Sequence, residues 1–225
     1  MNETTGNQGS AAVPAAVAGA SRPRFGEVTI RNRGRMPHWD KDGSLYFVTF
    51  HLADSLPESI REEIRKRWQL LEAARSSGRK LLKVEEDTLN KTSTKAIERL
   101  LDAGHGSCAL RDPRVAEIVA SALKFWDGNR YRLLSWCVMP NHVHVLFRVF
   151  PGERLAAIIG SWKSFTAKQA NRVLGRSGTF WQREYWDTLI RNEEHLNRAV
   201  AYIEANPERA GLATWQWVGR GSRGE

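Results

Sequence analysis

The chain has 225 residues, and 41% of them are hydrophobic, which is enough for a sizeable core in one domain with insertions or in two small domains. Its two cysteines, Cys108 and Cys137, are far apart and form no CxxC pair, which argues against a disulfide scaffold and a cysteine zinc site. The net charge of +9 favours an anionic partner such as nucleic acid, with a merely basic protein as the alternative. Because no apolar run is long enough to span a membrane and the N-terminus lacks the basic start of a signal peptide, we expect a cytoplasmic protein without a membrane partner.

The first half of the chain predicts a tail, one strand and a helical region. Residues 1–24 are small, polar and interrupted by proline, which is typical of a disordered tail. The segment SLYFVTFHL, residues 44–52, predicts the first strand because it is rich in β-branched and aromatic residues. Three helices are predicted next: one opening at Ser55–Glu58, one near residues 94–102, and one opening at Asp112–Pro113 and ending at Asp127–Gly128.

The second half alternates strands and helices. Residues 131–139 and 142–149 predict two strands joined by the short Pro140–Asn141 connection, which indicates an antiparallel hairpin. A helix with an apolar stripe follows Pro151–Gly152, and residues 178–191 predict a loop plus a strand. The last helix is predicted from Asn192 to Asn206–Pro207. This order predicts an α+β fold, a ferredoxin-like antiparallel sheet with packed helices and a helical insertion, at about residues 56–127, after the first strand.

The segment WCVMPNHVHVLF, residues 136–147, places two histidines two residues apart in a predicted strand. Side chains alternate between the faces of a strand, so His142 and His144 point the same way while Val143 and Val145 point the other way. Two imidazoles on one face suit a metal ion, and two ordinary histidines in a wet cleft are the alternative. The segment alone leaves both interpretations open.

The last predicted helix carries a second polar pair. Tyr202 and Asn206 are four residues apart and therefore lie on one helical face, at the border of the apolar stripe. If this helix packs on the histidine face of the sheet, two imidazoles and one amide oxygen form a mixed site that suits Mg²⁺, Mn²⁺ or Zn²⁺. Tyr202 beside such an ion is a candidate nucleophile, although a lone helical tyrosine is more often a packing residue.

Four segments together resemble the REP-associated tyrosine transposases, a family of single-tyrosine HUH transposases of the IS200-like group. They are RMPHWDKDGSLYFVTFHLADSLP, VMPNHVHVLF, SGTFWQREYWDTLIRNEEHL and AYIEANPERAGL, and the resemblance spans roughly residues 35–213. It implies one HUH domain at residues 25–213 and a C-terminal tail at residues 214–225. The HVH segment supplies the histidine pair of the motif, and Tyr202 lies where the family has its nucleophile. Asn206 occupies a position that is often glutamine in related transposases.

The resemblance implies an endonuclease and strand transferase that acts on single-stranded DNA, at hairpin-forming palindromic repeats. The implied site contains Tyr202 as the nucleophile and His142, His144 and Asn206 as ligands of Mg²⁺ or Mn²⁺. The implied product is a 5′-phosphotyrosine with a free 3′ hydroxyl. A monomer and a homodimer are both compatible with the sequence, as are action of Tyr202 within its own subunit and on a partner's site.

Four residues are predicted to contact DNA: Lys163, Trp181, Arg183 and Arg191. Basic side chains bind phosphates and aromatic rings stack on unpaired bases, but solvated charges and a core tryptophan are the alternatives. Two other functions remain open at this point. A metal-dependent hydrolase would use the HVH pair with a water nucleophile, and a domesticated, non-catalytic DNA-binding protein would need only the basic surface.

Overall fold

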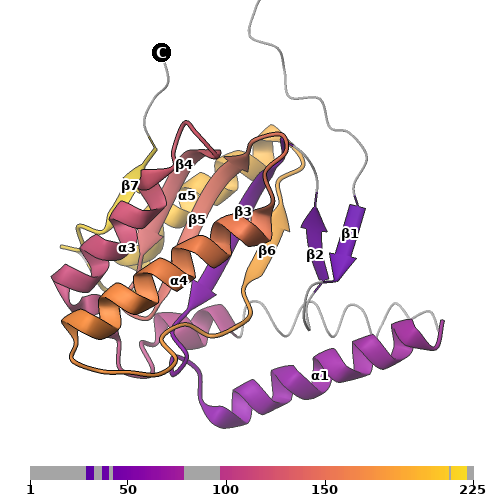
Figure 1. Ribbon diagram of the computed structural model, residues 1–225, viewed down its shortest axis with the longest axis horizontal. Coiled ribbons are helices and arrows are strands. Elements are labelled where there is room, and N and C mark those ends of the chain that lie inside the picture. Colours follow the sequence, from indigo (N-terminus) through magenta and orange to yellow (C-terminus); the bar gives the residue numbers. More distant parts are fainter. Residues whose placement is uncertain (1–28, 33–36, 41–42, 79–96, 213, 222–225) are drawn as a thin grey trace, which may run out of the picture.

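The computed structural model describes residues 29–32, 37–40, 43–78, 97–212 and 214–221. The tail predicted for residues 1–24 lies outside these residues. Figure 1 shows a central sheet with helices on both of its faces, which confirms the α+β class predicted from the order of elements. A separate two-stranded hairpin, β1 (Thr29–Asn32) and β2 (Pro37–Asp40), precedes the main sheet, and the sequence patterns do not predict it.

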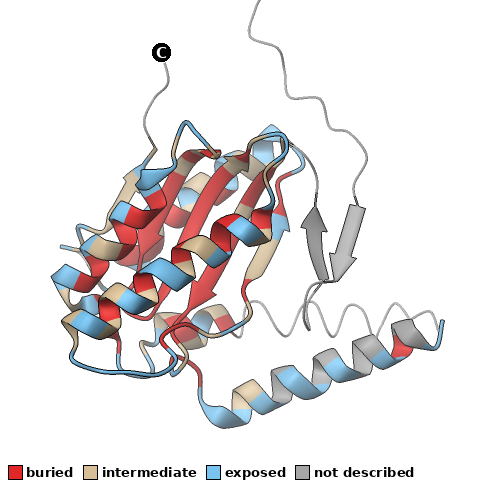
Figure 2. Cartoon of the chain, viewed as in Figure 1, coloured by how far each residue is buried: buried red, intermediate tan, exposed pale blue. Residues whose placement is uncertain are grey.

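Five antiparallel strands form the main sheet, in the order β6-β3-β5-β4-β7. The four predicted strands take the first four places, and their order along the chain, fourth-first-third-second, is that of a ferredoxin-like sheet. The strands are β3 (Leu45–His51), β4 (Tyr131–Val138), β5 (His142–Val149), β6 (Trp186–Leu189) and β7 (Val218–Arg220). Figure 2 shows the three central strands buried along almost their whole length.

Strand β7 corrects the prediction of a tail at residues 214–225. It pairs with β4, whose outer edge would otherwise leave its backbone N–H and C=O groups without partners. The pairing requires glycine at position 219, because a Cβ atom there would lie 2.8 Å from the ring of Trp136. The segment is short and shows no alternation of hydrophobic residues. It becomes a strand because it pairs with the open edge of β4.

Three helices cover the two faces of the sheet. Helices α3 (Pro113–Phe125) and α4 (Leu155–Val173) lie on one face, where Val143, Val145 and Phe147 of β5 join the larger core. Helix α5 (Glu193–Arg209) lies on the other face, where Ala199 and Ile203 pack with Leu146 in a smaller core. The histidines of β5 belong to this second face.

The remaining helical elements lie between β3 and α3, as the predicted insertion requires. They are α1 (Glu58–Ser76), a helical segment at residues 97–102 and the 3-10 turn η1 (Ala109–Arg111). Asp112 caps α3, where its carboxylate accepts from the backbone N–H of Arg114 at 2.9 Å. No helix in the described part of the chain is both long enough and apolar enough to cross a membrane.

Helix α5 differs from its prediction at the C-terminal end. Asn192 caps its start as predicted, but the helix continues through Pro207 to Arg209 instead of ending at Asn206. Proline has a backbone angle that fits a helix, and near the end of the helix its missing N–H and the crowding of its ring against the preceding turn are tolerated. As a consequence Asn206 is helical, 1% exposed, and turned towards the sheet.

Candidate functional site

Strand β5 brings His142 and His144 together on the face that α5 covers. Both side chains are 1% exposed, and their ring centres are 4.6 Å apart. The two Nε2 atoms face each other at 3.0 Å. The alternation of side chains along the strand therefore produces the predicted pair of imidazoles.

Neighbouring polar groups hold the outer nitrogen of each ring. His142 Nδ1 lies 2.8 Å from Asn141 Oδ1, which can only accept a hydrogen bond, so His142 carries its proton on Nδ1 and offers a lone pair at Nε2. The Asn141 amide is itself oriented, since its nitrogen donates to the carbonyl of His105 at 3.0 Å. His144 Nδ1 lies 2.8 Å from Oγ1 of Thr49, its partner across strand β3. The inner Nε2 atoms of the two rings therefore face each other.

Helix α5 places Tyr202 and Asn206 opposite these nitrogens, as expected if the last helix packs on the histidine face. The ring of Tyr202 lies 5.3 Å from the ring of His144 and 5.8 Å from the ring of Phe47. The Tyr202 hydroxyl and both polar atoms of the Asn206 side chain are buried and make no hydrogen bond of regular geometry. Buried polar atoms without partners are rare in proteins, and a group of them beside two imidazoles indicates a ligand site.

Burial sets the protonation states of the site. It lowers the pKa of His144 to about 3, with a smaller effect of Arg209 in the same direction, and it lowers the pKa of His142 well below the ordinary value. Both rings are therefore neutral at pH 7, which metal ligation requires. Burial also raises the pKa of Tyr202, and the carboxylates of Glu98 and Asp102 raise it further, so the phenol is protonated at neutral pH.

The residues present fit a divalent metal ion. Two ligands that bind one ion at about 2.1 Å and at right angles lie about 3.0 Å apart, which matches the observed distance between the Nε2 atoms of His142 and His144. The buried Asn206 side chain adds an oxygen ligand of the kind that hard cations accept. Among the residues that the structure describes, no three His, Cys, Asp or Glu side chains already form a metal cluster.

Three further residues lie near this site that the sequence patterns do not predict to be part of it. Arg209 is exposed and its guanidinium lies 5.1 Å from the centre of the Tyr202 ring. Asp102 has a buried Oδ1 without a hydrogen bond, 3.9 Å from Nε2 of His142. His51 pairs with His142 across the strands and stacks on Trp186, with a distance of 4.9 Å between ring centres. Of these, only Arg209 carries a signal in the sequence, since it lies seven residues, or two helical turns, after Tyr202.

The predicted DNA-contacting residues occupy two places. Lys163, Trp181 and Arg183 line a cavity of about 470 Å³ between α4 and the segment before β6, and Arg191 lines another, of about 310 Å³, where β6 meets α5. Arg183 and Arg191 are exposed. Lys163 is not a free cation at the surface, because its Nζ donates to the carbonyls of residues 182 and 183 at 2.6 and 2.7 Å.

Trp181 is a core residue in this structure. It is 5% exposed, its ring contacts the ring of Phe50 at 4.8 Å, and its Nε1 donates to Thr166 Oγ1 at 2.9 Å. A DNA base could not stack on this ring without opening the core. The prediction that Trp181 stacks on a base is therefore corrected, because its ring is packed in the hydrophobic core.

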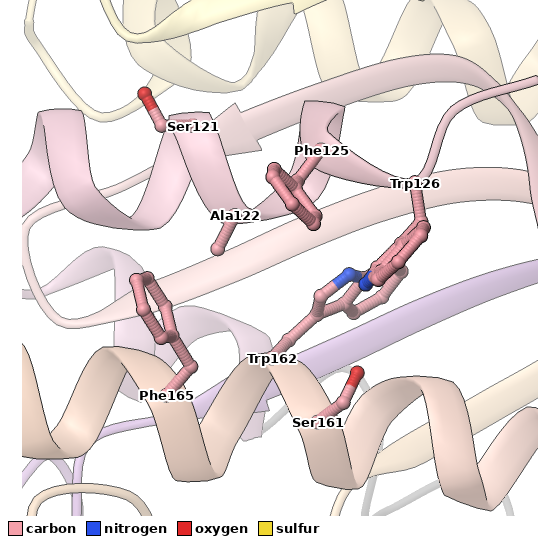
Figure 3. Close-up of a pocket in the computed structure, with 7 residues that line it drawn as sticks. All are labelled: Ser121, Ala122, Phe125, Trp126, Ser161, Trp162 and Phe165. Atoms are coloured by element: carbon pink, nitrogen blue, oxygen red, sulfur yellow. The ribbon is translucent and has the colours of Figure 1, made fainter.

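A further cavity lies on the opposite face of the sheet from the histidines, between α3 and α4. Figure 3 shows that it is lined mainly by apolar side chains, with Phe125, Trp126, Trp162 and Phe165 around it. Its only polar lining residues, two serines, are bonded within their own helices. With a volume of about 250 Å³ and no titratable side chain, it offers no catalytic chemistry.

Comparison with known proteins shows which proteins this chain is similar to. Residues 110–206, less than half of the chain, match the family model described as IS200-like transposase. The chain is similar to the REP-associated tyrosine transposase of Escherichia coli K12, with 26% identity over 89 residues that cover 40% of this chain and 52% of that protein. It shares 29% identity, over 36% of this chain and 52% of the relative, with a Haemophilus influenzae protein named for the same family. The resemblance to REP-associated tyrosine transposases is thereby confirmed.

The match is partial in length. The chain spans about half the length of the curated relatives it matches. A solved structure of a REP-associated tyrosine transposase bound to a REP hairpin superposes with a TM-score of 0.46 at 16% identity, over 80% of this chain and 79% of that one. The matched segment of the family model contains both histidines, Tyr202 and Asn206.

Proposed function

We propose that this domain cleaves and transfers single-stranded DNA through a covalent bond to Tyr202. The observation that carries the proposal is the packing of Tyr202 against the histidine pair, with 5.3 Å between the ring centres of Tyr202 and His144. A hydrolase with a water nucleophile would need no tyrosine at this position. The match to the IS200-like transposases supports DNA as the substrate class.

The proposed reaction is a transesterification at a backbone phosphate. The Tyr202 oxygen attacks phosphorus, the new O–P bond forms, and the P–O3′ bond breaks. The phenol loses its proton and the released 3′ oxygen gains one, which leaves a 5′-phosphotyrosine and a free 3′ hydroxyl. Since the phosphodiester is exchanged and not hydrolysed, rejoining requires no nucleotide cofactor.

The protonated phenol needs positive charge nearby, because burial holds its pKa above the ordinary value for tyrosine. A divalent ion such as Mg²⁺ or Mn²⁺, held by His142, His144 and Asn206, would supply charge that stabilises the developing anion. Arg209, exposed beside the phenol ring, is placed to donate to a non-bridging oxygen of the same phosphate.

The proposed substrate is a single strand that carries a hairpin, as the family resemblance implies. Exposed basic side chains lie at the β6–α5 junction, where Arg191 and Arg198 line one cavity. Such side chains bind phosphates without reading sequence, so DNA affinity is expected to fall steeply with salt.

Formation of a covalent adduct tests the reaction. The full chain is incubated with a hairpin oligonucleotide labelled at its 3′ end, because the fragment bound to tyrosine carries the 3′ part of the strand. We expect a labelled protein band on a denaturing gel in the presence of Mg²⁺ or Mn²⁺ and none for Tyr202→Phe. Tyr185→Phe, which changes a buried tyrosine outside the site, is the matched control and should keep the band. An adduct with Tyr202→Phe would contradict the proposal.

The same assay tests the substrate class. A hairpin with single-stranded flanks is compared with an uninterrupted duplex of the same sequence. We expect the adduct with the hairpin strand only. Equal adduct formation on both would leave the nucleophile assignment intact and would refute the preference for single-stranded DNA.

A further inference from the structure

We propose that Asp102 is a ligand of the divalent ion that the proposed function requires at His142 and His144. The inference rests on that proposed function and adds a carboxylate to its site. Asp102 ends the helical segment at residues 97–102, in the insertion between β3 and α3. Its side chain is 22% exposed, and its Oδ1 is buried without a hydrogen bond.

The position of this oxygen matches that of a ligand in a shared coordination shell. Two atoms that each bind one ion at about 2.1 Å are about 3.0 Å apart if they bind at right angles and about 4.2 Å apart if they bind on opposite sides. His142 Nε2 lies 3.0 Å from His144 Nε2 and 3.9 Å from Asp102 Oδ1, so both distances fall in this range. The described residues hold no assembled group of three acidic, histidine or cysteine side chains, so Asp102 would have to move towards the ion to bind it.

The charge of the site favours an anionic ligand such as the Asp102 carboxylate. The ligands proposed so far, two imidazoles and the Asn206 amide, carry no negative charge, and Arg209 acts on Asp102 as a nearby positive charge. A buried divalent cation has an unfavourable free energy unless an anionic ligand accompanies it. Mg²⁺ and Mn²⁺ also prefer carboxylate oxygens to imidazole nitrogens. Asp102 supplies the missing negative charge.

Other partners do not satisfy Asp102 within the described residues. Burial raises the pKa of Asp102 and the charge of Arg209 counteracts this rise, but the two side chains form no ion pair. Its distance of 3.9 Å from His142 Nε2 is too long for a hydrogen bond. The carboxylate oxygen is buried without a hydrogen bond, 3.9 Å from the Nε2 atom of His142, and a cation between the two atoms would stabilise this arrangement.

Binding of Mn²⁺ alone to the full chain tests the inference without any cleavage. Asp102→Asn keeps the shape and removes the charge, and we expect it to weaken Mn²⁺ binding at least about tenfold by calorimetry or by the electron paramagnetic resonance signal of free Mn²⁺. Glu98→Gln is the matched control, since Glu98 lies one turn earlier on the same segment and its charge also reaches Tyr202. This control should bind Mn²⁺ like the parent chain, and Asp102→Glu should restore most of the affinity.

The outcomes separate this inference from the proposed function. Unchanged Mn²⁺ affinity in Asp102→Asn overturns the inference, and so does an equal loss in Glu98→Gln, which would indicate long-range charge and not ligation. Failure of the parent chain to bind Mn²⁺ overturns it as well. If Asp102→Asn loses Mn²⁺ affinity while the parent chain forms no DNA adduct, Asp102 is a ligand and the proposed cleavage reaction fails alone.

Discussion

Replacement of Thr49 by valine removes the hydroxyl that orients His144 while it keeps the size and the β-branched shape of the side chain. The Thr49 Oγ1 atom lies 2.8 Å from His144 Nδ1, and the two residues are 6% and 1% exposed, so water cannot replace the lost hydrogen bond. A buried polar atom left without a partner costs about 1–3 kcal/mol of stability. For a domain of this size each kcal/mol lowers the midpoint of thermal unfolding by about 2–4 °C.

The same change should weaken metal binding. When His144 Nε2 binds an ion, the ring proton lies on Nδ1 and Thr49 Oγ1 accepts it; without the oxygen, this tautomer loses its support. Loss of such a second contact behind a histidine ligand lowers metal affinity by about 10–100-fold. We therefore expect Thr49→Val to raise the Mn²⁺ dissociation constant by this factor, measured by calorimetry on the folded variant.

Thr166→Val is the matched control for this prediction. Thr166 is 1% exposed, donates to the Trp162 carbonyl at 2.7 Å and accepts from Trp181 Nε1 at 2.9 Å, on the opposite face of the sheet. It should lose a comparable amount of stability and keep the parent's Mn²⁺ affinity. An unchanged Mn²⁺ affinity in Thr49→Val, or an equal loss in both variants, would refute the reasoning.

Three further predictions concern charge. Burial lowers the pKa of His51 to about 4 and that of His144 to about 3, so below pH 6.5 the unfolded chain binds more protons than the folded one. The metal-free protein should lose about 2 kcal/mol per histidine between pH 6.5 and pH 5, and a constant unfolding midpoint would contradict this. Arg209→Gln should slow adduct formation about 10–100-fold, measured in single-turnover reactions at saturating Mn²⁺; an unchanged rate would remove Arg209 from the phosphate site. Lys163→Met should lower stability by about 1–3 kcal/mol, because two backbone carbonyls lose their donor, and leave the salt dependence of DNA binding unaltered. A salt slope reduced by about one unit would instead show that Lys163 contacts phosphate.

Local patterns were sufficient to predict much of the site. Alternation along a strand places His142 and His144 on one face, whatever the sheet around them, and the helical repeat places Tyr202 and Asn206 on one face. The caps at Asp112 and Asn192 begin their helices by the same local logic. These features depend on residues within a few positions of each other, which is why sequence alone determined them.

The tertiary structure decided which of these local features meet and what else joins them. The strand order places Thr49 beside His144, which is 95 positions away in the sequence. Asp102 lies near His142 although it belongs to an insertion, and the sequence of that insertion does not indicate which residues it contacts. Trp181 illustrates the opposite outcome, since an aromatic segment that could have stacked on bases is drawn into the core by burial of its ring. Strand β7 forms because β4 has an open edge, a property of the sheet and not of residues 218–220. Sequence determines local geometry through backbone sterics and periodicity, whereas long-range contacts depend on how the whole chain minimises exposed apolar surface and unpaired polar groups.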